Sequence, residues 1–230
     1  MKILITRPLE DAEPTARRLL AMGHQPLVAP ILATHFEEGP QLALQGVQAI
    51  LATSANGVRA IARRTPRRDL AVLAVGPQTA AEAKAAGFLK VCNADGDAQA
   101  LARAVPQWAR PEGGPLLHVR SGDSAGTLAQ SLRAAGFEID EAILYRVEPL
   151  ALSAEARAAL KMGRIDAALF YSPRSAATFR DLARREGIDT SSLVGLCISH
   201  AAADALAPAP FRQIRIAAKP NQDALLSLLD

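Results

Sequence analysis

"ATSANGVRAI" at residues 52–61 and "FYSPRSAATF" at residues 170–179 follow the same pattern. In each stretch, a short apolar run precedes a serine, a small polar turn and a segment with helical spacing. The two serines, Ser54 and Ser172, lie 118 positions apart. An apolar strand that leads through a capping residue into a helix is the basic step of an α/β fold. Its recurrence suggests a duplicated unit.

The same alternation runs along the chain. Candidate strands fall at 2–6, 26–32, 47–53, 70–75, 89–92, 115–120, 138–147, 165–171, 193–198 and 212–217. Candidate helices fall at 9–22, 57–63, 77–86, 97–106, 123–135, 153–161, 174–185, 199–206 and 221–229, with N-caps at Asp97, Ser153 and Asn221 and C-terminal stops at Gly23, Gly87 and Gly136. This order predicts an α/β fold of parallel sheets flanked by helices.

Residue correspondences test the duplication. Arg7 corresponds to Arg120 at an offset of 113, and Ser54 to Ser172 at 118. Leu101 corresponds to Leu225 at 124. Offsets that rise slowly in one direction are what a duplicated unit with short loop insertions gives. A shared strand–helix rhythm without duplication is the alternative interpretation.

Composition narrows the class of protein. The 230 residues are enough for one large or two compact domains, and aromatic residues make up only 4%, so the core is expected to be aliphatic. The formal charge of +3 favours an anionic small ligand. Nucleic acid is disfavoured because the basic cluster "RRTPRR" at 63–68 is short and is expected to be a solvated helix end.

Cysteine use and hydropathy predict the compartment. Cys92 and Cys197 lie in apolar runs without metal-ligand spacing or a disulfide framework, as expected of buried thiols in a reducing compartment. The start "MKILITRP" is too short in apolar residues for a secretion signal, and no run approaches the ~20 apolar residues of a membrane span. We therefore expect a cytoplasmic protein, monomeric, with no metal and no membrane partner.

Polar residues gather where the predicted strands end. In open parallel sheets, ligands bind outside the carboxyl ends of the strands, and helix N-termini there favour anions. Two such rims facing each other would form a cleft for a large polyanion. The candidate residues at these positions are Thr6, Arg7, Ser54, Asn56, Gly76, Thr79, Arg120, Ser121, Ser172, Ser175, Ser199, His200 and Lys219.

Five motifs resemble the uroporphyrinogen-III synthase family: "ITRP" at 5–8, "ATSANGVRA" at 52–60, "AVGPQTA" at 74–80, "YRV" at 145–147 and "YSPRSA" at 171–176. They occur in the family's order over essentially the whole chain. The resemblance implies two similar α/β domains joined by a pair of extended linker strands. One domain would hold 1–34 plus 149–230 and the other 37–142, with linkers near 29–36 and 142–148.

The resemblance also implies a reaction. Enzymes of this family dehydrate linear hydroxymethylbilane, a polycarboxylate, and close it with the terminal pyrrole ring inverted, without cofactor or metal. Tyr145 matches the family tyrosine proposed to protonate the leaving hydroxyl. The implied substrate-binding residues are Arg7, Ser54, Asn56, Gly76, Thr79, Arg120, Ser121, Ser172, Ser175, Ser199 and Lys219. One motif departs from the family: its second glycine-rich turn reads "ISHAAA" here, with Ser199 in place of glycine.

Each candidate also has a structural interpretation. Tyr145 could pack a linker strand, and the serines could cap helices. Gly76 could allow a close backbone approach or a tight turn, and Arg7 could pair with Glu10 or Asp11. Two other functions fit parts of the sequence: a two-domain small-anion binding module without catalysis, and a sugar-phosphate isomerase.

An isomerase would need a Glu or His base beside a phosphate loop, and neither is evident in the sequence. A binding module would give no type III isomer from hydroxymethylbilane.

Overall fold

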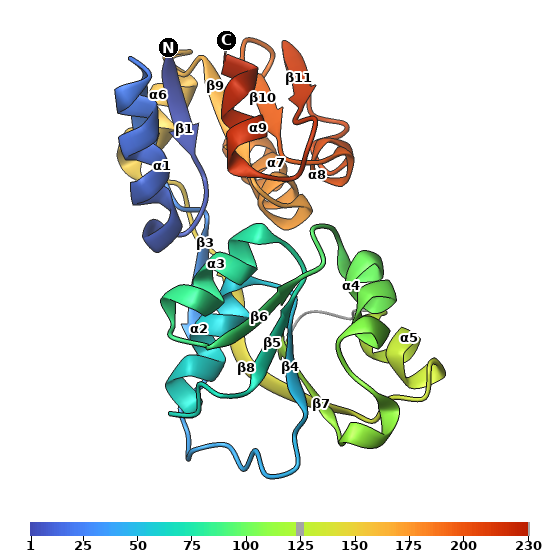
Figure 1. Cartoon of the computed structure of the whole chain (residues 1–230). Helices are drawn as coiled ribbons and strands as arrows, with labels where there is room; N and C mark the ends of the chain where they lie inside the picture. Colours follow the sequence, from blue (N-terminus) through green and yellow to red (C-terminus); the bar gives the residue numbers. More distant parts are fainter. Residues whose placement is uncertain (123–126, 230) are drawn as a thin grey trace. The chain divides into compact units, whose positions relative to one another are not determined.

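The computed structural model describes residues 1–122 and 127–229. Its contacts divide the chain into two compact units. The first unit comprises Met1–Ala33 and Glu148–Asp230, and the second comprises Thr34–Val147. Figure 1 shows that the first unit is built from both ends of the chain.

The first unit contains a five-stranded parallel sheet in the order β11-β10-β9-β1-β2. Its strands are β1 (Lys2–Ile5), β2 (Gln25–Val28), β9 (Ala167–Phe170), β10 (Val194–Cys197) and β11 (Gln213–Ile216). Its helices are α1 (Leu9–Ala21), α6 (Ala154–Lys161), α7 (Pro173–Glu186), α8 (His200–Asp204) and α9 (Gln222–Leu226), the last followed by a 3₁₀ turn at Ser227–Leu229.

The second unit contains most of a six-stranded sheet in the order β3-β8-β7-β4-β5-β6. Its strands are β3 (Leu32–Phe36), β4 (Ala49–Ala52), β5 (Ala71–Ala74), β6 (Lys90–Asn93), β7 (Leu116–Ser121) and β8 (Ile139–Pro149). Its helices are α2 (Ala55–Arg64), α3 (Pro77–Ala85), α4 (Ala98–Ala104) and α5 (Leu128–Ala134), with 3₁₀ turns at Val105–Gln107 and Pro111–Gly113. The division between the units falls within β3 and β8.

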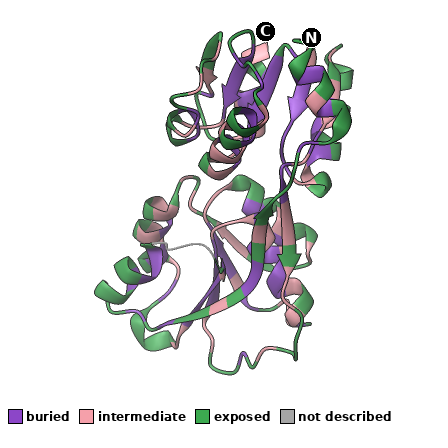
Figure 2. Cartoon of the chain, turned by 180° about the vertical axis from the view of Figure 1, so that it is seen from behind, coloured by how far each residue is buried: buried purple, intermediate pink, exposed green. Residues whose placement is uncertain are grey.

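Both faces of each sheet are covered, which explains the continuous apolar runs. In β4, Ile50 and Ala52 pack with α2 and α3, while Ala49 and Leu51 pack with α4 and α5. This is the period of two that a strand imposes, with both faces buried as in parallel sheets. Central strands such as β4, β9 and β10 are fully buried, whereas edge strands such as β6 and β11 are partly exposed, and Figure 2 shows the outward helix faces exposed.

The sheet of the first unit is also packed against helices, mainly through aliphatic side chains. Ile3 and Ile5 of β1 pack in one cluster with Leu19 of α1 and with residues of α9. Elsewhere in this unit, the ring of Phe170 lies 5.2 Å from that of Phe179 on α7 and 6.2 Å from that of Phe211. The aliphatic core expected from the composition is thus supplemented by one phenylalanine cluster.

Strand order supports the duplication. The sequence offsets pair β1 and β2 with β7 and β8, and they pair β4, β5 and β6 with β9, β10 and β11. The five matched strands then have the same order in both sheets, β2-β1-β9-β10-β11 and β8-β7-β4-β5-β6. A shared rhythm alone does not require a shared strand order. Each unit therefore combines two strands of one copy with three of the other.

Most predicted boundaries hold, with specific exceptions. The N-caps at Asp97, Ser153 and Asn221 are confirmed by side-chain hydrogen bonds to the first turns of α4, α6 and α9. The single strand predicted at 26–32 is wrong: β2 ends at Val28 and β3 begins at Leu32, because Pro30 between them has no N–H to donate. Of the helix predicted at 123–135, residues 123–126 lie outside the described residues.

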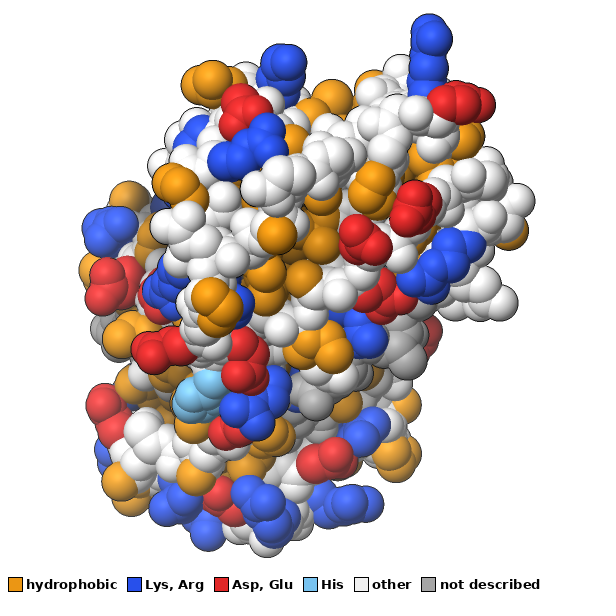
Figure 3. Space-filling model, turned by 90° about the horizontal axis from the view of Figure 1, so that it is seen from below, with side chains coloured by type: hydrophobic (Ala, Val, Ile, Leu, Met, Phe, Trp, Pro, Cys, Tyr) orange, Lys and Arg blue, Asp and Glu red, His pale blue; other side chains and the backbone are white. Residues whose placement is uncertain are grey.

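The basic cluster at 63–68 is less solvated than expected. Arg68 donates to the backbone oxygens of Ala62 and Ala86, near the ends of α2 and α3. Arg64 donates to the oxygens of Glu37 and Pro40. These arginines satisfy carbonyls that have no helical partner. On the face shown in Figure 3, cationic and anionic side chains are interspersed.

No helix among the described residues is long and apolar enough to cross a bilayer. The same residues contain no group of three or more His, Cys, Asp or Glu side chains placed to hold a metal ion. Cys92 and Cys197 are free thiols; Cys197 is buried as expected, but Cys92, on the edge strand β6, is only half-buried. Burial raises the pKa of the Cys197 thiol to about 12, so this side chain is an unreactive core group.

Candidate functional site

Four helices begin in the same way, two in each unit. Ser54, Gly76, Ser172 and Ser199 each lie two residues beyond a strand and cap the helix that follows. Their φ and ψ angles are −156° and 157°, −159° and 175°, −161° and 157°, and −157° and 164°. The repeat therefore places four equivalent helix starts at the carboxyl edges of the two sheets, where anionic ligands are commonly bound.

The three serines do cap their helices. The Oγ atom of Ser54 accepts a hydrogen bond from the Gly57 N–H at 3.1 Å, and that of Ser199 accepts one from Ala202 at 3.3 Å. Ser172 and Ser175 form a reciprocal capping box, so the Ser175 hydroxyl is buried and engaged. Capping leaves Ser54, Ser172 and Ser199 half-buried.

Gly76 is not required by the backbone. Its φ of −159° is open to any residue, and an added Cβ atom would lie no closer than 3.7 Å to its nearest neighbour, the backbone oxygen of Gly96. The interpretation of Gly76 as a tight-turn residue is therefore wrong. Thr79, in the first turn of the same helix, is buried.

A β-bulge sets the position of Tyr145. The register of β7 and β8 pairs Arg120 with Ile143 and then Ser121 with Tyr145, so Leu144 is the extra residue. Because of this insertion, Leu144 and Tyr145 both point into the cluster beneath α2, although neighbouring strand residues normally face opposite sides. The Tyr145 hydroxyl reaches the Oγ atom of Ser54 at 2.8 Å.

Other candidates of the second unit lie near this pair. Ser121 is buried opposite Tyr145 across the two strands. The Asn56 side chain donates to Thr34 at 2.9 Å and accepts from Arg59 at 3.1 Å. The structure thus brings Ser54, Ser121 and Tyr145 to one part of the sheet edge.

Arg120 is held by a carboxylate. Its Nε atom lies 2.6 Å from Glu141, whose other carboxylate oxygen accepts from Arg133 at 3.0 Å. The hydrogen bond from Arg133, followed by that from Arg120, lowers the pKa of the Glu141 carboxyl. His118, opposite Glu141 in the register, is only 3% exposed, and within the described residues neither ring nitrogen has a hydrogen-bond partner. Burial lowers the pKa of this histidine.

Arg7 occupies a similarly closed position in the first unit. It is only 6% exposed, and its guanidinium lies 3.3 Å from the Asp11 carboxylate. It also donates to Gln222 at 3.1 Å and stacks over the Tyr171 ring at 4.0 Å. The ion pair with Asp11 that the sequence left open is therefore present.

Thr6 is also closed off, because it is fully buried and its hydroxyl donates to the backbone oxygen of Leu169 at 2.8 Å. Other candidates of the first unit are more accessible. Ser199 and the exposed His200 line a shallow pocket of about 420 Å³ together with Ile216 and Pro220. Lys219 is exposed beside this pocket in sequence. Arg174, at the start of α7, is half-buried.

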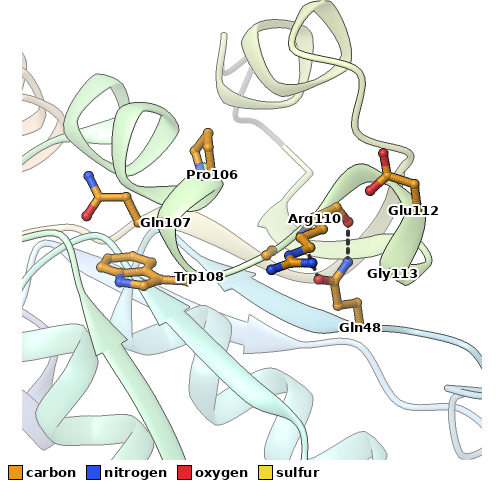
Figure 4. A pocket seen from close by; sticks show the side chains of 8 residues that line it. Gln48, Pro106, Gln107, Trp108, Arg110, Glu112 and Gly113 are labelled. Atoms are coloured by element: carbon orange, nitrogen blue, oxygen red, sulfur yellow. Dashed lines mark hydrogen bonds between the residues drawn. The ribbon is translucent and has the colours of Figure 1, made fainter.

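A larger pocket of about 560 Å³ lies away from these residues. Figure 4 shows Gln48, Trp108 and Arg110 around it, with Gln48 bonded to the backbone of Arg110. Gln48 immediately precedes β4, so this pocket is at the amino end of that strand. The candidate residues follow the carboxyl ends, and none of them lines it.

Sequence reasoning missed the partners that hold the candidates in place. Glu141 forms an ion pair with Arg120, Thr34 accepts a hydrogen bond from Asn56, and Gln222 accepts one from Arg7. These residues are distant in sequence from the side chains they hold, so no local pattern identifies them. The alternation of β8 does place Glu141 beside the arginine strand once the register is known.

The fold and the helix starts define an α/β protein of two similar units, with capped helix starts along the carboxyl edge of a parallel sheet in each, where proteins of this class commonly bind anionic groups. The family model described as "Uroporphyrinogen-III synthase HemD" matches residues 13–227. The chain belongs to the uroporphyrinogen-III synthase family, whose members are cyclising lyases of tetrapyrrole biosynthesis. The family predicted from the five motifs is thus confirmed.

Solved structures agree on the fold. Uroporphyrinogen-III synthetase from Helicobacter pylori is 17% identical, with a TM-score of 0.66 over 99% of this chain and 97% of that chain. A mutant uroporphyrinogen III synthase from the extremely thermophilic bacterium Thermus thermophilus is 21% identical, with a TM-score of 0.59 over 100% of this chain and 97% of that chain. These likenesses confirm the predicted fold class. No curated protein sequence matches the chain significantly.

Proposed function

We propose that this chain dehydrates hydroxymethylbilane and closes it to uroporphyrinogen III, with the terminal pyrrole ring inverted, and that Tyr145 supplies the proton for the leaving hydroxyl. The observation that carries the proposal is the 2.8 Å contact between Tyr145 and Ser54 at the carboxyl edge of a sheet, in a chain of this family. A phenol held in this way is a suitable general acid.

The substrate's carboxylates would be bound by helix starts. The first turns of α2, α3 and α7 carry partial positive charge and backbone N–H groups that lie before the regular helical hydrogen bonds, and both features stabilise anions. Ser54, Gly76 and Ser172 lie at these termini, and Asn56, Thr79 and Ser121 lie close to them in the sequence or fold. Ser199 and Lys219 would add contacts at the smaller pocket.

Three candidates are better supported as residues that shape the site. Arg7 is paired with Asp11, Arg120 with Glu141, and the Ser175 hydroxyl with the Ser172 backbone. Each would bind substrate only by giving up a buried or half-buried partner. We therefore assign them a supporting role first and a direct carboxylate contact second.

We further propose that the two units act as domains, with β3 and β8 as the linker strands. The unit boundaries at Ala33 and Val147 fall inside these strands. We also propose that the protein works as a cytoplasmic monomer, without cofactor or metal. Its free thiols are consistent with a reducing compartment.

Incubation with hydroxymethylbilane tests the reaction. The type III isomer is expected in place of the spontaneous type I product, whereas an anion-binding module would bind the bilane and leave the type I product unchanged. Tyr145→Phe is expected to lower kcat by about 10²-fold or more with little change in KM, because general-acid help is worth about 10²–10⁴. Tyr171→Phe is the matched control, since Tyr171 is the other tyrosine of the chain. Full turnover by Tyr145→Phe would exclude the acid role.

A further inference from the structure

Tyr145 is poorly placed to touch the substrate itself. The residue is only 5% exposed and packs in the cluster formed with Val58, Ile61 and Leu144. Ser54, its hydrogen-bond partner, is half-buried at the edge of the sheet. A proton that leaves Tyr145 toward the rim therefore meets the serine hydroxyl first.

The hydrogen bonds of Ser54 suit a transfer. A serine hydroxyl has one donor and two acceptor sites. The Gly57 N–H occupies one acceptor site at 3.1 Å, and in one of the two orientations open to the pair the Tyr145 hydroxyl donates to the second at 2.8 Å. In this orientation the proton of Ser54 is left for a third group at the rim. A departing hydroxyl of the substrate is such a group.

We propose that Ser54 is a proton relay between Tyr145 and the leaving hydroxyl, an inference that rests on the proposed function. Ser54 donates its proton as the carbon–oxygen bond breaks and water departs, and it takes the Tyr145 proton in the same step. The products are a cationic bilane, an intact serine and a tyrosinate. Ring inversion breaks the bond between the terminal pyrrole and its bridge carbon and joins that carbon to the unsubstituted α-carbon of the same ring. This α-carbon then loses its proton, which returns through Ser54 to Tyr145.

The start of α2 offsets part of the cost of a buried tyrosinate. Ser54 caps α2, a helix of ten residues whose N-terminus carries partial positive charge. Gly57 lets that terminus approach β7, because a Cβ atom there would lie 3.3 Å from the backbone oxygen of Val119. The close approach fixes the serine over the tyrosine.

The duplicated unit offers an internal contrast. Ser172 is the counterpart of Ser54, with the same cap and nearly the same backbone angles. The counterpart of Tyr145 at the offset of 113 is Leu32, which has no proton to give. Ser172 is bonded instead to Ser175. The relay therefore belongs to one copy only.

The test compares kcat for type III formation in the wild type, Ser54→Ala, Ser54→Thr, Tyr145→Phe and the Ser54→Ala/Tyr145→Phe double variant. Each variant that loses a hydroxyl is expected to lose about 10²-fold or more, and the double variant no more than either single one, because residues that act as a unit are not additive. Ser54→Thr keeps the hydroxyl and is expected to stay within about tenfold of the wild type.

Ser153→Ala controls for the lost cap. Ser153 caps α6 through a 3.2 Å bond to Ala156, so its loss should lower the unfolding midpoint as Ser54→Ala does while kcat is kept. Losses in the double variant that multiply would overturn the relay, as would near-normal kcat in Ser54→Ala. Full activity of Tyr145→Phe would overturn the proton source. A wild-type protein that forms no type III isomer would reject the proposed function itself, before any variant is compared.

Discussion

The substitution Gly76→Ser tests whether the glycine at the start of α3 is needed for the backbone conformation or for contact with a ligand. The backbone there is extended, with φ of −159° and ψ of 175°. Ser199 has φ of −157° and ψ of 164° at the equivalent helix start of the other unit and is a serine. An added Cβ atom would meet only an ordinary contact at 3.7 Å. The fold should therefore accept serine.

The expected magnitudes follow from this geometry. A serine hydroxyl can cap α3 as Ser199 caps α8, which is worth a few tenths of a kcal/mol over glycine. Restricting the unfolded chain adds about 0.4–1 kcal/mol. The free energy of unfolding should thus rise by about 1 kcal/mol. A carboxylate held at this helix start would lose a charge-assisted hydrogen bond worth about 1.5–3 kcal/mol, so KM should rise about tenfold or more.

Urea unfolding and steady-state kinetics measure the two effects. Trp108 is the single tryptophan and lies in the same unit as Gly76, so its fluorescence can report unfolding there. Gly136→Ser is the contrasting control: its φ is +88°, and a side chain in that region costs about 1–2 kcal/mol. A destabilised Gly76→Ser would refute the steric reasoning. A stabilised variant with unchanged KM would refute the ligand contact.

Two buried groups give further predictions. Arg7→Met should destabilise the protein by about 3–5 kcal/mol because it leaves the Asp11 carboxylate without its arginine, and adding Asp11→Leu should restore most of that free energy. A KM that stays high in the stable double variant would establish Arg7 as a substrate contact. An unchanged free energy of unfolding in Arg7→Met would contradict the ion pair. His118 has a pKa lowered by burial, raised in part by Glu141 and lowered further by Arg120 and Arg133. Below about pH 6.5, the ordinary pKa of histidine, the unfolded chain therefore binds more protons than the folded protein. The free energy of unfolding should fall as the pH is lowered from there, by at most about 1.4 kcal/mol per pH unit. His118→Leu should flatten this slope in urea titrations at successive pH values, and an unchanged slope would contradict the assignment.

The amino-acid sequence alone was sufficient for the repeat and the helix starts. These depend on local rules: apolar runs form buried strands, and serine caps helices two residues after a strand ends. Ser54, Ser172 and Ser199 were therefore predictable as rim residues, and so were the caps at Asp97 and Asn221.

Long-range pairing decided the rest. No local sequence pattern indicates that β1 and β2 pair in one sheet with β9, β10 and β11 of the second copy, because strand partners depend on the packing of both sheet faces. Nor does sequence reveal the bulge at Leu144, which depends on the register between β7 and β8. If β7 and β8 paired regularly instead, Leu144 would lie opposite Ser121, and Tyr145 would face the other side of the sheet and could not meet Ser54. The sequence supplied both hydroxyls, and the tertiary structure brought them within 2.8 Å.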